Sequence, residues 1–314
     1  MQHRRAIMGI VLARIFIRPM RVIFDRSAFH GARFELLEAS PLRRLVANRR
    51  VTIFHTPVFL DEIIQSYGSH RASDIWRKHL EFAARICDGG IFLPKDDIWR
   101  SELIDGRGRL AQRLLPPEAN EQHDSFHGFL GTLLRTADTG DLSSEWEESA
   151  AERADVYQKK ANQRLLFRGA RDEVARALRT RQVKGALKDY PFSEYRRSEF
   201  NRNGRSLMRL VDESRCNELA DLWEANPEQY PYYTAFVEGF VYSQYYAAIE
   251  HNKPLDRNAQ ADFEQLAYLT WSDIVVSDDE GFFRSAFDVI WRPRGKLLES
   301  AADFAARLRD IAAR

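Results

Sequence analysis

Short apolar runs that alternate with helix-like segments restrict the fold of this chain more than any other feature. Each run has three or four residues, mostly β-branched or aromatic, which is typical of a strand buried on both faces. We expect strands at 22–24, 51–54, 91–93, 274–276 and 289–291. Segments with helical spacing, such as 58–67 and 301–313, lie between or after them. The alternation predicts an α/β fold, with helices on both faces of a parallel sheet.

The middle of the chain interrupts this alternation. Between 104 and 252 the sequence is long, charged and helix-rich, without obvious strands, so we interpret it as a helical insertion. The segments 20–103 and 253–314 then form one α/β core of ordinary domain size. Within the insertion, 153–207 holds fifteen Lys or Arg residues against six Asp or Glu, whereas the aromatic cluster at 230–246 is expected to pack between helices.

Charge, cysteines and the amino terminus bear on compartment and partners. The 47 basic and 46 acidic residues nearly cancel, so the net charge of +1 indicates no general attraction to nucleic acid or membranes. Cys87 and Cys216 are far apart and lack a CxxC partner, which argues against a disulfide framework and fits the cytoplasm. The apolar run at 6–17 contains Arg14 and is shorter than the ~20 residues that span a bilayer, so we interpret 1–19 as a peripheral extension.

Acidic residues follow two of the predicted strands. Asp25 comes directly after 22–24, and the pair at 278–279 comes shortly after 274–276. In an open parallel sheet, ligands bind outside the carboxyl ends of the strands, and we expect Glu62 and Asp262 to lean over the same crevice from helices. Converging carboxylates repel one another unless cations neutralise them, and Mg²⁺ or Mn²⁺ is the natural choice. A metal bound there would support phosphodiester hydrolysis.

The segments that carry these acids resemble the PIN domain nucleases. Residues 20–29 (MRVIFDRSAF) are similar to the opening strand of that family, its acid and the serine or threonine that follows. Residues 56–63 (TPVFLDEI) are similar to the segment with its glutamate. Residues 262–282 (DFEQLAYLTWSDIVVSDDEGF) are similar to its third acid, the helix behind it, and the strand that ends in an acid before an aromatic residue. The resemblance covers about half of the chain.

The resemblance implies both an architecture and a chemistry. It implies a PIN-like three-layer α/β/α domain with a central parallel sheet, here with an inserted helical subdomain. It also implies a metal-dependent endonuclease that hydrolyses phosphodiester bonds, with RNA as the preferred substrate and Mg²⁺ or Mn²⁺ as the cofactor. The catalytic metal ligands would be Asp25, Glu62, Asp262 and Asp279, with Asp278 as an auxiliary ligand and Ser27 as a hydrogen-bonding support.

Each of these acids also has an ordinary structural interpretation. Asp25 could cap the following helix, and Asp262 could complement a helix dipole near the amino terminus of its helix. The acids at 278–279 could form an Asx turn. Asp61 competes with Glu62 for the ligand position, because neighbouring residues on a helix diverge by about 100° and only one of them faces the crevice.

The basic residues suggest how nucleic acid would bind. Positive groups track phosphates, and aromatic residues interleaved with them stack on unpaired bases, although a charged helical stretch is more often a solvated face. The candidates are Arg26, Lys159, Lys160, Arg164, Arg168 and Arg171. The expected partner is single-stranded or structured RNA, and a second copy of the chain or an inhibitory protein is also open. The alternative function is a catalytically silent PIN-like module that binds RNA or a protein partner.

Overall fold

The computed structural model describes most of the predicted core and part of the helical region. The described residues are 18–69, 75–87, 90–105, 191–250 and 258–313, with four isolated positions at 173, 176, 177 and 180. Most of the amino-terminal extension lies outside them, and so do five of the six nucleic-acid candidates, Lys159, Lys160, Arg164, Arg168 and Arg171. Every statement below concerns the described residues.

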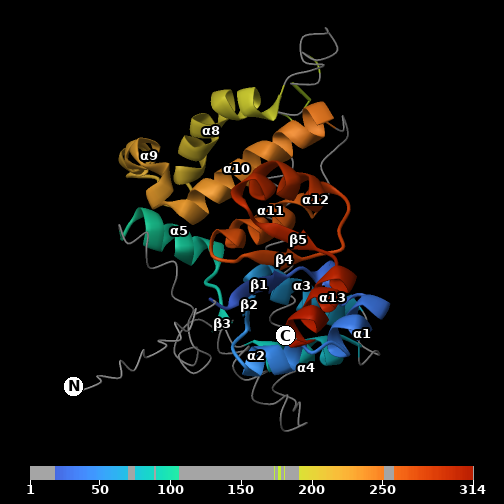
Figure 1. Cartoon of the computed structure of the whole chain (residues 1–314). Coiled ribbons are helices and arrows are strands. Elements are labelled where there is room, and N and C mark those ends of the chain that lie inside the picture. Colours follow the sequence, from blue (N-terminus) through green and yellow to red (C-terminus); the bar gives the residue numbers. More distant parts are fainter. Residues whose placement is uncertain are drawn as a thin grey trace, which may run out of the picture.

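A sheet of five parallel strands forms the centre of the protein (Figure 1). Its order is β3-β2-β1-β4-β5. The strands are β1 (Met20–Phe24), β2 (Val51–His55), β3 (Gly90–Ile91), β4 (Ile274–Val276) and β5 (Leu297–Glu299). The chain therefore adds β2 and β3 on one side of β1, and later adds β4 and β5 on the other side. The predicted α/β class with a parallel sheet is confirmed.

Alternate residues of each strand enter two separate cores. Ile23, Phe54 and Val275 pack into the core on one face of the sheet. Their neighbours Val22, Phe24, Ile53, Ile274 and Val276 pack into the core on the other face. Successive strand residues point to opposite faces, so a strand with apolar side chains at every position is buried on both sides. This explains why the strands are continuous apolar runs in the sequence.

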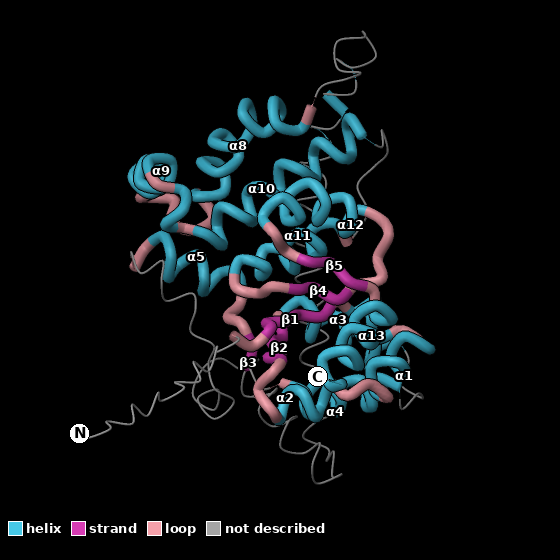
Figure 2. The backbone as a smooth tube through the Cα atoms, in the orientation of Figure 1, coloured by secondary structure: helices cyan, strands magenta, loops and turns pink. Residues whose placement is uncertain are grey.

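The helices lie on both sides of this sheet (Figure 2). One face is covered by α1 (Ala32–Glu38), α2 (Leu42–Ala47), α3 (Pro57–Ser69), α4 (Ile75–Ile86) and α13 (Ala301–Ala313). The other face carries α5 (Lys95–Leu103), α8 (Phe192–Met208), α9 (Cys216–Ala225), α10 (Pro231–Tyr245), α11 (Ala259–Ala267) and α12 (Phe282–Ala286). Within the described ranges, none of the helices combines the length and the apolar character that crossing a bilayer requires.

The described part of the predicted insertion is helical and joins the core of the protein. Its α10 packs against α8 on one side and α11 on the other. Tyr232, Tyr233 and Tyr242 have no exposed surface, which confirms the prediction that this aromatic cluster packs between helices. Gly239 allows α10 to lie close to α11, because a Cβ atom at this position would lie 2.6 Å from Cβ of Phe263 on α11. The aromatic cluster is therefore not a surface for stacking bases.

The prediction of a strand at 289–291 is wrong. These residues belong to a π-helical turn, η7 (Phe287–Trp291), which continues directly from α12. Phe283, Phe287, Ile290 and Trp291 are all buried on the same helical run, and a window of three residues is too short to reveal that spacing. The last strand is instead β5, which the sequence analysis did not identify.

Candidate active site at the carboxyl edge of the sheet

The parallel pairing of β1 and β4 brings Asp25 and Ser277 together. Phe24 lies opposite Val276 in the register of these two strands, so the next residue of each chain segment leaves the sheet at the same edge. This is also where the direction of strand addition reverses. Ligands in open α/β sheets bind outside the carboxyl ends of the strands at such a point. The strand order therefore predicts a ligand-binding site at this edge of the sheet.

The Asp25 carboxylate is held firmly through one of its two oxygens. Its Oδ2 atom accepts hydrogen bonds from the Ser27 backbone N–H at 3.0 Å, the Ser27 hydroxyl at 2.5 Å and the Ser277 hydroxyl at 2.9 Å. Its Oδ1 atom accepts no hydrogen bond from any described residue. Only 9% of Asp25 is exposed. The bonds to Ser27 cap the short 3-10 helix η1 (Arg26–Phe29), and they leave the second oxygen without a described hydrogen-bond donor.

Two serine hydroxyls extend this network into the loop after β4. The Ser27 hydroxyl lies 3.0 Å from that of Ser277 and accepts a hydrogen bond from the Asp278 backbone N–H at 2.8 Å. The Ser277 hydroxyl accepts from the Asp279 backbone N–H at 3.1 Å. Ser27 was predicted as a support, whereas Ser277 was not considered. Its signal was present in the sequence, because it follows β4 just as Asp25 follows β1.

The acids after β4 have structural partners. Asp278 accepts a hydrogen bond at Oδ2 from the Ala301 backbone N–H, at the start of α13, and its Oδ1 lies 3.6 Å from Nε of Arg33. Asp279 Oδ1 accepts from the Gly281 backbone N–H at 2.7 Å, which is the hydrogen bond of an Asx turn. Both acids therefore help to shape the loop after β4. A metal role for them stays a prediction.

Helix α11 carries Asp262 across the same edge. Gln265 donates from Nε2 to the Phe24 carbonyl oxygen at 2.7 Å, and the Thr56 hydroxyl donates to Gln265 Oε1. These bonds fix α11 over the last residue of β1 and the residue after β2. Because side chains three positions apart share a helix face, Asp262 lies on the side of α11 that carries Gln265. The helix therefore turns the face shared by Asp262 and Gln265 toward the sheet, and the convergence of Asp262 with Asp25 stays a prediction.

Glu62 and its neighbour Asp61 lie on α3, the helix that contacts both α11 and η1. Burial raises the pKa of Tyr268, and the nearby charges of Glu264 and Asp61 raise it further. Asp61 is thus near enough to Tyr268 for its charge to affect the pKa of that residue. Since adjacent helical side chains diverge by about 100°, Glu62 has a different direction, and its role as the ligand stays a prediction.

The donor set can be compared with what a hard divalent cation requires. No group of three or more His, Cys, Asp or Glu side chains in the described ranges is arranged to bind a metal ion. Mg²⁺, however, keeps several waters and often takes only one or two carboxylates from the protein. Asp25 fits one such position, because its free oxygen is oriented by hydrogen bonds on the other oxygen. Outer partners of this kind commonly orient metal ligands.

Basic side chains flank Asp25 on the side of η1 and α1. Arg33 Nη1 donates to the Ser27 carbonyl oxygen at 3.4 Å, and its ion pair with Asp278 is described above. Burial lowers the pKa of His30, and the charges of Arg26 and Arg33 lower it further, whereas Asp25 opposes them. Burial, His30 and Arg26 together lower the pKa of His79 to about 4. Both histidines are therefore biased toward the neutral form beside two arginines.

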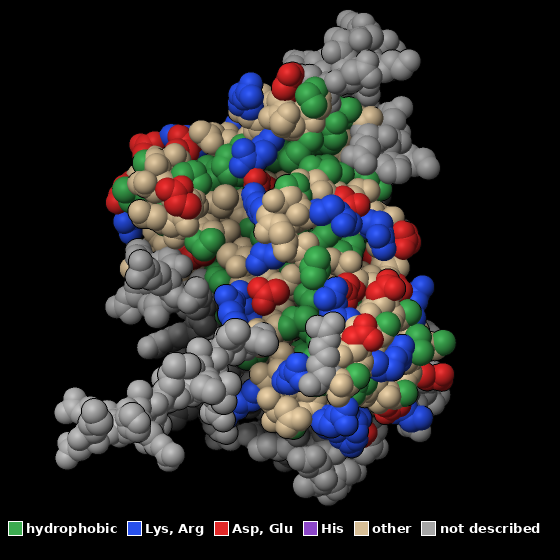
Figure 3. All heavy atoms as spheres, viewed as in Figure 1, with side chains coloured by type: hydrophobic (Ala, Val, Ile, Leu, Met, Phe, Trp, Pro, Cys, Tyr) green, Lys and Arg blue, Asp and Glu red, His purple; other side chains and the backbone are tan. Residues whose placement is uncertain are grey.

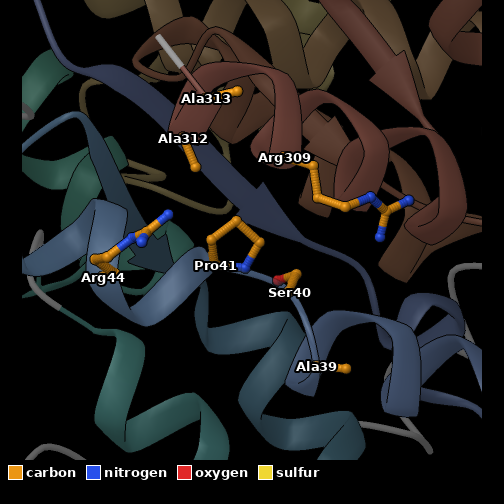
Figure 4. A pocket seen from close by; sticks show the side chains of 7 residues that line it. All are labelled: Ala39, Ser40, Pro41, Arg44, Arg309, Ala312 and Ala313. Atoms are coloured by element: carbon orange, nitrogen blue, oxygen red, sulfur yellow. The ribbon is translucent and has the colours of Figure 1, made fainter.

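The described surface on one face of the protein has mixed charge. Lys, Arg, Asp and Glu side chains are interspersed over the face shown in Figure 3. An open hollow of about 550 Å³ lies where the carboxyl end of α13 meets the turn between α1 and α2 (Figure 4). Its lining residues are Ala39, Ser40, Pro41, Arg44, Arg309, Ala312 and Ala313. The hollow is at the opposite end of α13 from Ala301, and so it is separate from the Asp25 network.

Comparisons with protein-family models, with curated proteins and with solved structures find no match for this chain.

Proposed function

We propose that this protein is a metal-dependent nuclease of the PIN type that hydrolyses phosphodiester bonds, with RNA as its preferred substrate. The observation that carries the proposal is the state of Asp25. It stands at the reversal point of a parallel sheet, three donors hold one of its oxygens, and the other accepts no hydrogen bond from a described residue. A carboxylate oriented in this way is suited to bind a cation.

The proposed roles extend the observation on Asp25 to the acids that the resemblance in the sequence singles out. Asp25 is the central ligand for Mg²⁺ or Mn²⁺, and Ser27 and Ser277 orient it. Glu62, Asp262 and Asp279 complete the acidic group, with Asp278 as an auxiliary ligand. A divalent ion supplies a water of lowered pKa and stabilises negative charge on the leaving oxygen. No side-chain nucleophile is required.

The parallel sheet of order β3-β2-β1-β4-β5, with helices on both faces, supports a PIN-like three-layer architecture for the segments that resemble that family. Cys87 and Cys216 are not joined in a disulfide bond, which is in keeping with a protein of the cytoplasm. The partner would be single-stranded or structured RNA. The proposal treats the helical region as a flank of the nuclease core.

Replacing Asp25 by asparagine tests this function. The change keeps the shape of the side chain but removes a negative charge and an anionic ligand, so metal-dependent cleavage of a single-stranded RNA pool should fall at least ~100-fold, or about 3 kcal/mol in the barrier. The matched control is Asp288→Asn, at a partly exposed acid that is paired with Arg292. Equal cleavage by wild type and Asp25→Asn, measured as initial rates in Mn²⁺, would remove the proposed role of Asp25.

A second function is favoured by the acids after β4. Both oxygens of Asp278 have partners, and Asp279 closes an Asx turn, as expected where loop shape rather than metal binding is maintained. A catalytically silent PIN-like module would then bind RNA or a protein partner. The same assays separate the two functions. If the module is silent, wild type binds RNA in EDTA but does not cleave it at any Mn²⁺ concentration.

A further inference from the structure

The turn from η1 into α1 gathers positive charge immediately after Asp25. Arg26 is the first residue of η1, and Arg33 lies in the first turn of α1. Arg33 reaches back to this turn through the Ser27 carbonyl oxygen at 3.4 Å and approaches Asp278 at 3.6 Å. The two arginines therefore border the same hydrogen-bonded network that holds Asp25.

Arg26 contributes charge that no described residue neutralises. Its side chain is half-buried, and it has no hydrogen bond or ion pair with another described residue. Arg33 has one acidic partner, but 47% of its side chain is exposed, so much of its guanidinium is accessible. A half-buried cation without a partner is stabilised when an anion binds beside it.

We propose that Arg26 and Arg33 form a phosphate-binding rim, which holds a backbone phosphate of single-stranded nucleic acid beside Asp25. The guanidinium fork matches the geometry of phosphate oxygens, and Arg33 keeps donors available beyond its contact with Ser27. The rim lies on the same edge of the sheet as the open oxygen of Asp25. This inference rests on the proposed nuclease function and adds the anionic group that the protein would grip.

The lowered pKa values of the neighbouring histidines agree with a positive electrostatic field around Arg26 and Arg33. Burial is the main reason why the pKa of His30 is lowered, and Arg26 and Arg33 lower it further. Burial also lowers the pKa of His79 to about 4, with contributions from His30 and Arg26. His79 packs against the rings of Phe34 and Phe29, with centroids 4.5 Å and 5.7 Å away. Arg26 and Arg33 are thus two permanent cations near histidines whose pKa values are lowered.

The test measures binding without metal. The probe is a labelled single-stranded RNA of about 12 nucleotides in EDTA, followed by fluorescence anisotropy at several salt concentrations. We expect Arg26→Gln with Arg33→Gln to weaken binding at least ~10-fold at low salt. The slope of log K against log salt should become shallower by about 0.7, because the rim holds one phosphate and each phosphate contact in single strands contributes about 0.7. A DNA strand of the same sequence should lose as much, since a phosphate contact does not read the 2′-hydroxyl.

The control pair is Arg44→Gln with Arg309→Gln, which removes two positive charges from the hollow at the far end of α13 (Figure 4). This pair should change binding less than about twofold. Arg26→Gln alone should also weaken binding, and it has no described hydrogen bond or ion pair to lose, so it serves if the double variant is unstable. Arg33→Lys should recover only part of the loss, because it restores the charge but not the fork.

The outcomes keep this inference separate from the nuclease proposal. Equal losses in the two pairs, undiminished binding by Arg26→Gln, or no measurable binding by wild type would each overturn the rim. If the rim variants lose RNA binding while wild type cuts nothing in Mn²⁺, the rim stands and the nuclease proposal fails. If wild type cuts RNA and the rim variants bind it normally, the nuclease stands and the rim fails.

Discussion

The carboxyl edge of the sheet and the helical layer each contain buried acids, but the two regions use them differently. In the helical layer, Glu102 accepts the backbone N–H groups of Tyr232 and Tyr233 at 3.0 and 2.9 Å, one on each oxygen. Glu238 also uses both oxygens, accepting from Arg196 and Arg294. Asp25 uses only one. Both oxygens of Glu102 and Glu238 are thus used by the fold, whereas Oδ1 of Asp25 has no described hydrogen-bond donor. Glu299, at the end of β5, also has one oxygen without a described partner, but that atom is buried from solvent.

The largest expected effect on stability is at Glu238. It is 3% exposed and links α8 to the turn before β5 through its two arginines. In Glu238→Gln the amide would face a guanidinium, donor against donor, and two cations would lose their shared anion. We expect the free energy of unfolding in urea to fall by about 2–3 kcal/mol, less than for a fully buried triad because the arginines can reach water.

Glu228→Gln is the matched control, since this glutamate is exposed in the turn before α10. It should change the free energy of unfolding by less than about 0.5 kcal/mol. If Glu238→Gln is no more destabilising than this control, a buried acid with partners on both oxygens does not stabilise the fold more than an exposed acid does.

A smaller effect, which depends on pH, is expected at Glu102. Burial raises the pKa of Glu102 from 4.5 to about 7, although the two backbone N–H groups at the start of α10 oppose the rise. Between these pH values the native state holds a proton that the unfolded state has lost. The stabilisation from Glu102 is therefore complete below about pH 4.5 and is lost as pH rises through about 7.

Glu102→Gln removes this titration. We expect the stability difference between wild type and variant to shrink by about 1–2 kcal/mol from pH 5 to pH 8. Urea unfolding at four or five pH values in that window measures it. A difference that is constant with pH, or one that grows toward pH 8, would show that the carboxylate is charged throughout and that the helix amino terminus outweighs burial.

The smallest effect on folding is expected for Asp25→Asn in EDTA. The amide oxygen can take the place of Oδ2 and accept the same three hydrogen bonds, while the NH₂ group occupies the open position. Stability should therefore change by no more than about 1 kcal/mol. Asp25→Ala leaves the donors of Ser27 and Ser277 unsatisfied and should cost about 2 kcal/mol. Equal costs for the two variants would mean that the three hydrogen bonds do not hold Asp25.

The sequence predicted the elements whose signal is local. The apolar runs before Asp25 and Ser277 identify β1 and β4, and a parallel sheet necessarily delivers their carboxyl ends to one edge. The aromatic cluster at 230–246 was recognisable as a core because aromatic and apolar residues fill most of its positions. The run at 289–291 was misread, since three apolar residues fit a strand and a helix equally well.

The partners within the site could not be predicted in the same way. Asp278 accepts a hydrogen bond from the Ala301 backbone N–H because α13 begins at this edge, and it meets Arg33 because α1 packs against α13. Gln265 reaches the Phe24 carbonyl across 241 positions of sequence. Such contacts depend on how finished elements pack, and no local pattern encodes them.

The most direct test of the account is whether Mn²⁺ stabilises the protein through Asp25. Thermal unfolding of wild type and Asp25→Asn should be followed over a Mn²⁺ titration from zero to about 10 mM. If the open oxygen of Asp25 binds the ion with a dissociation constant of about 0.1 mM, wild type should gain about 2.7 kcal/mol at the highest concentration, and Asp25→Asn should gain much less. Equal gains in the two proteins, or no gain in wild type, would contradict the central claim that this carboxylate is held in place for a metal ion.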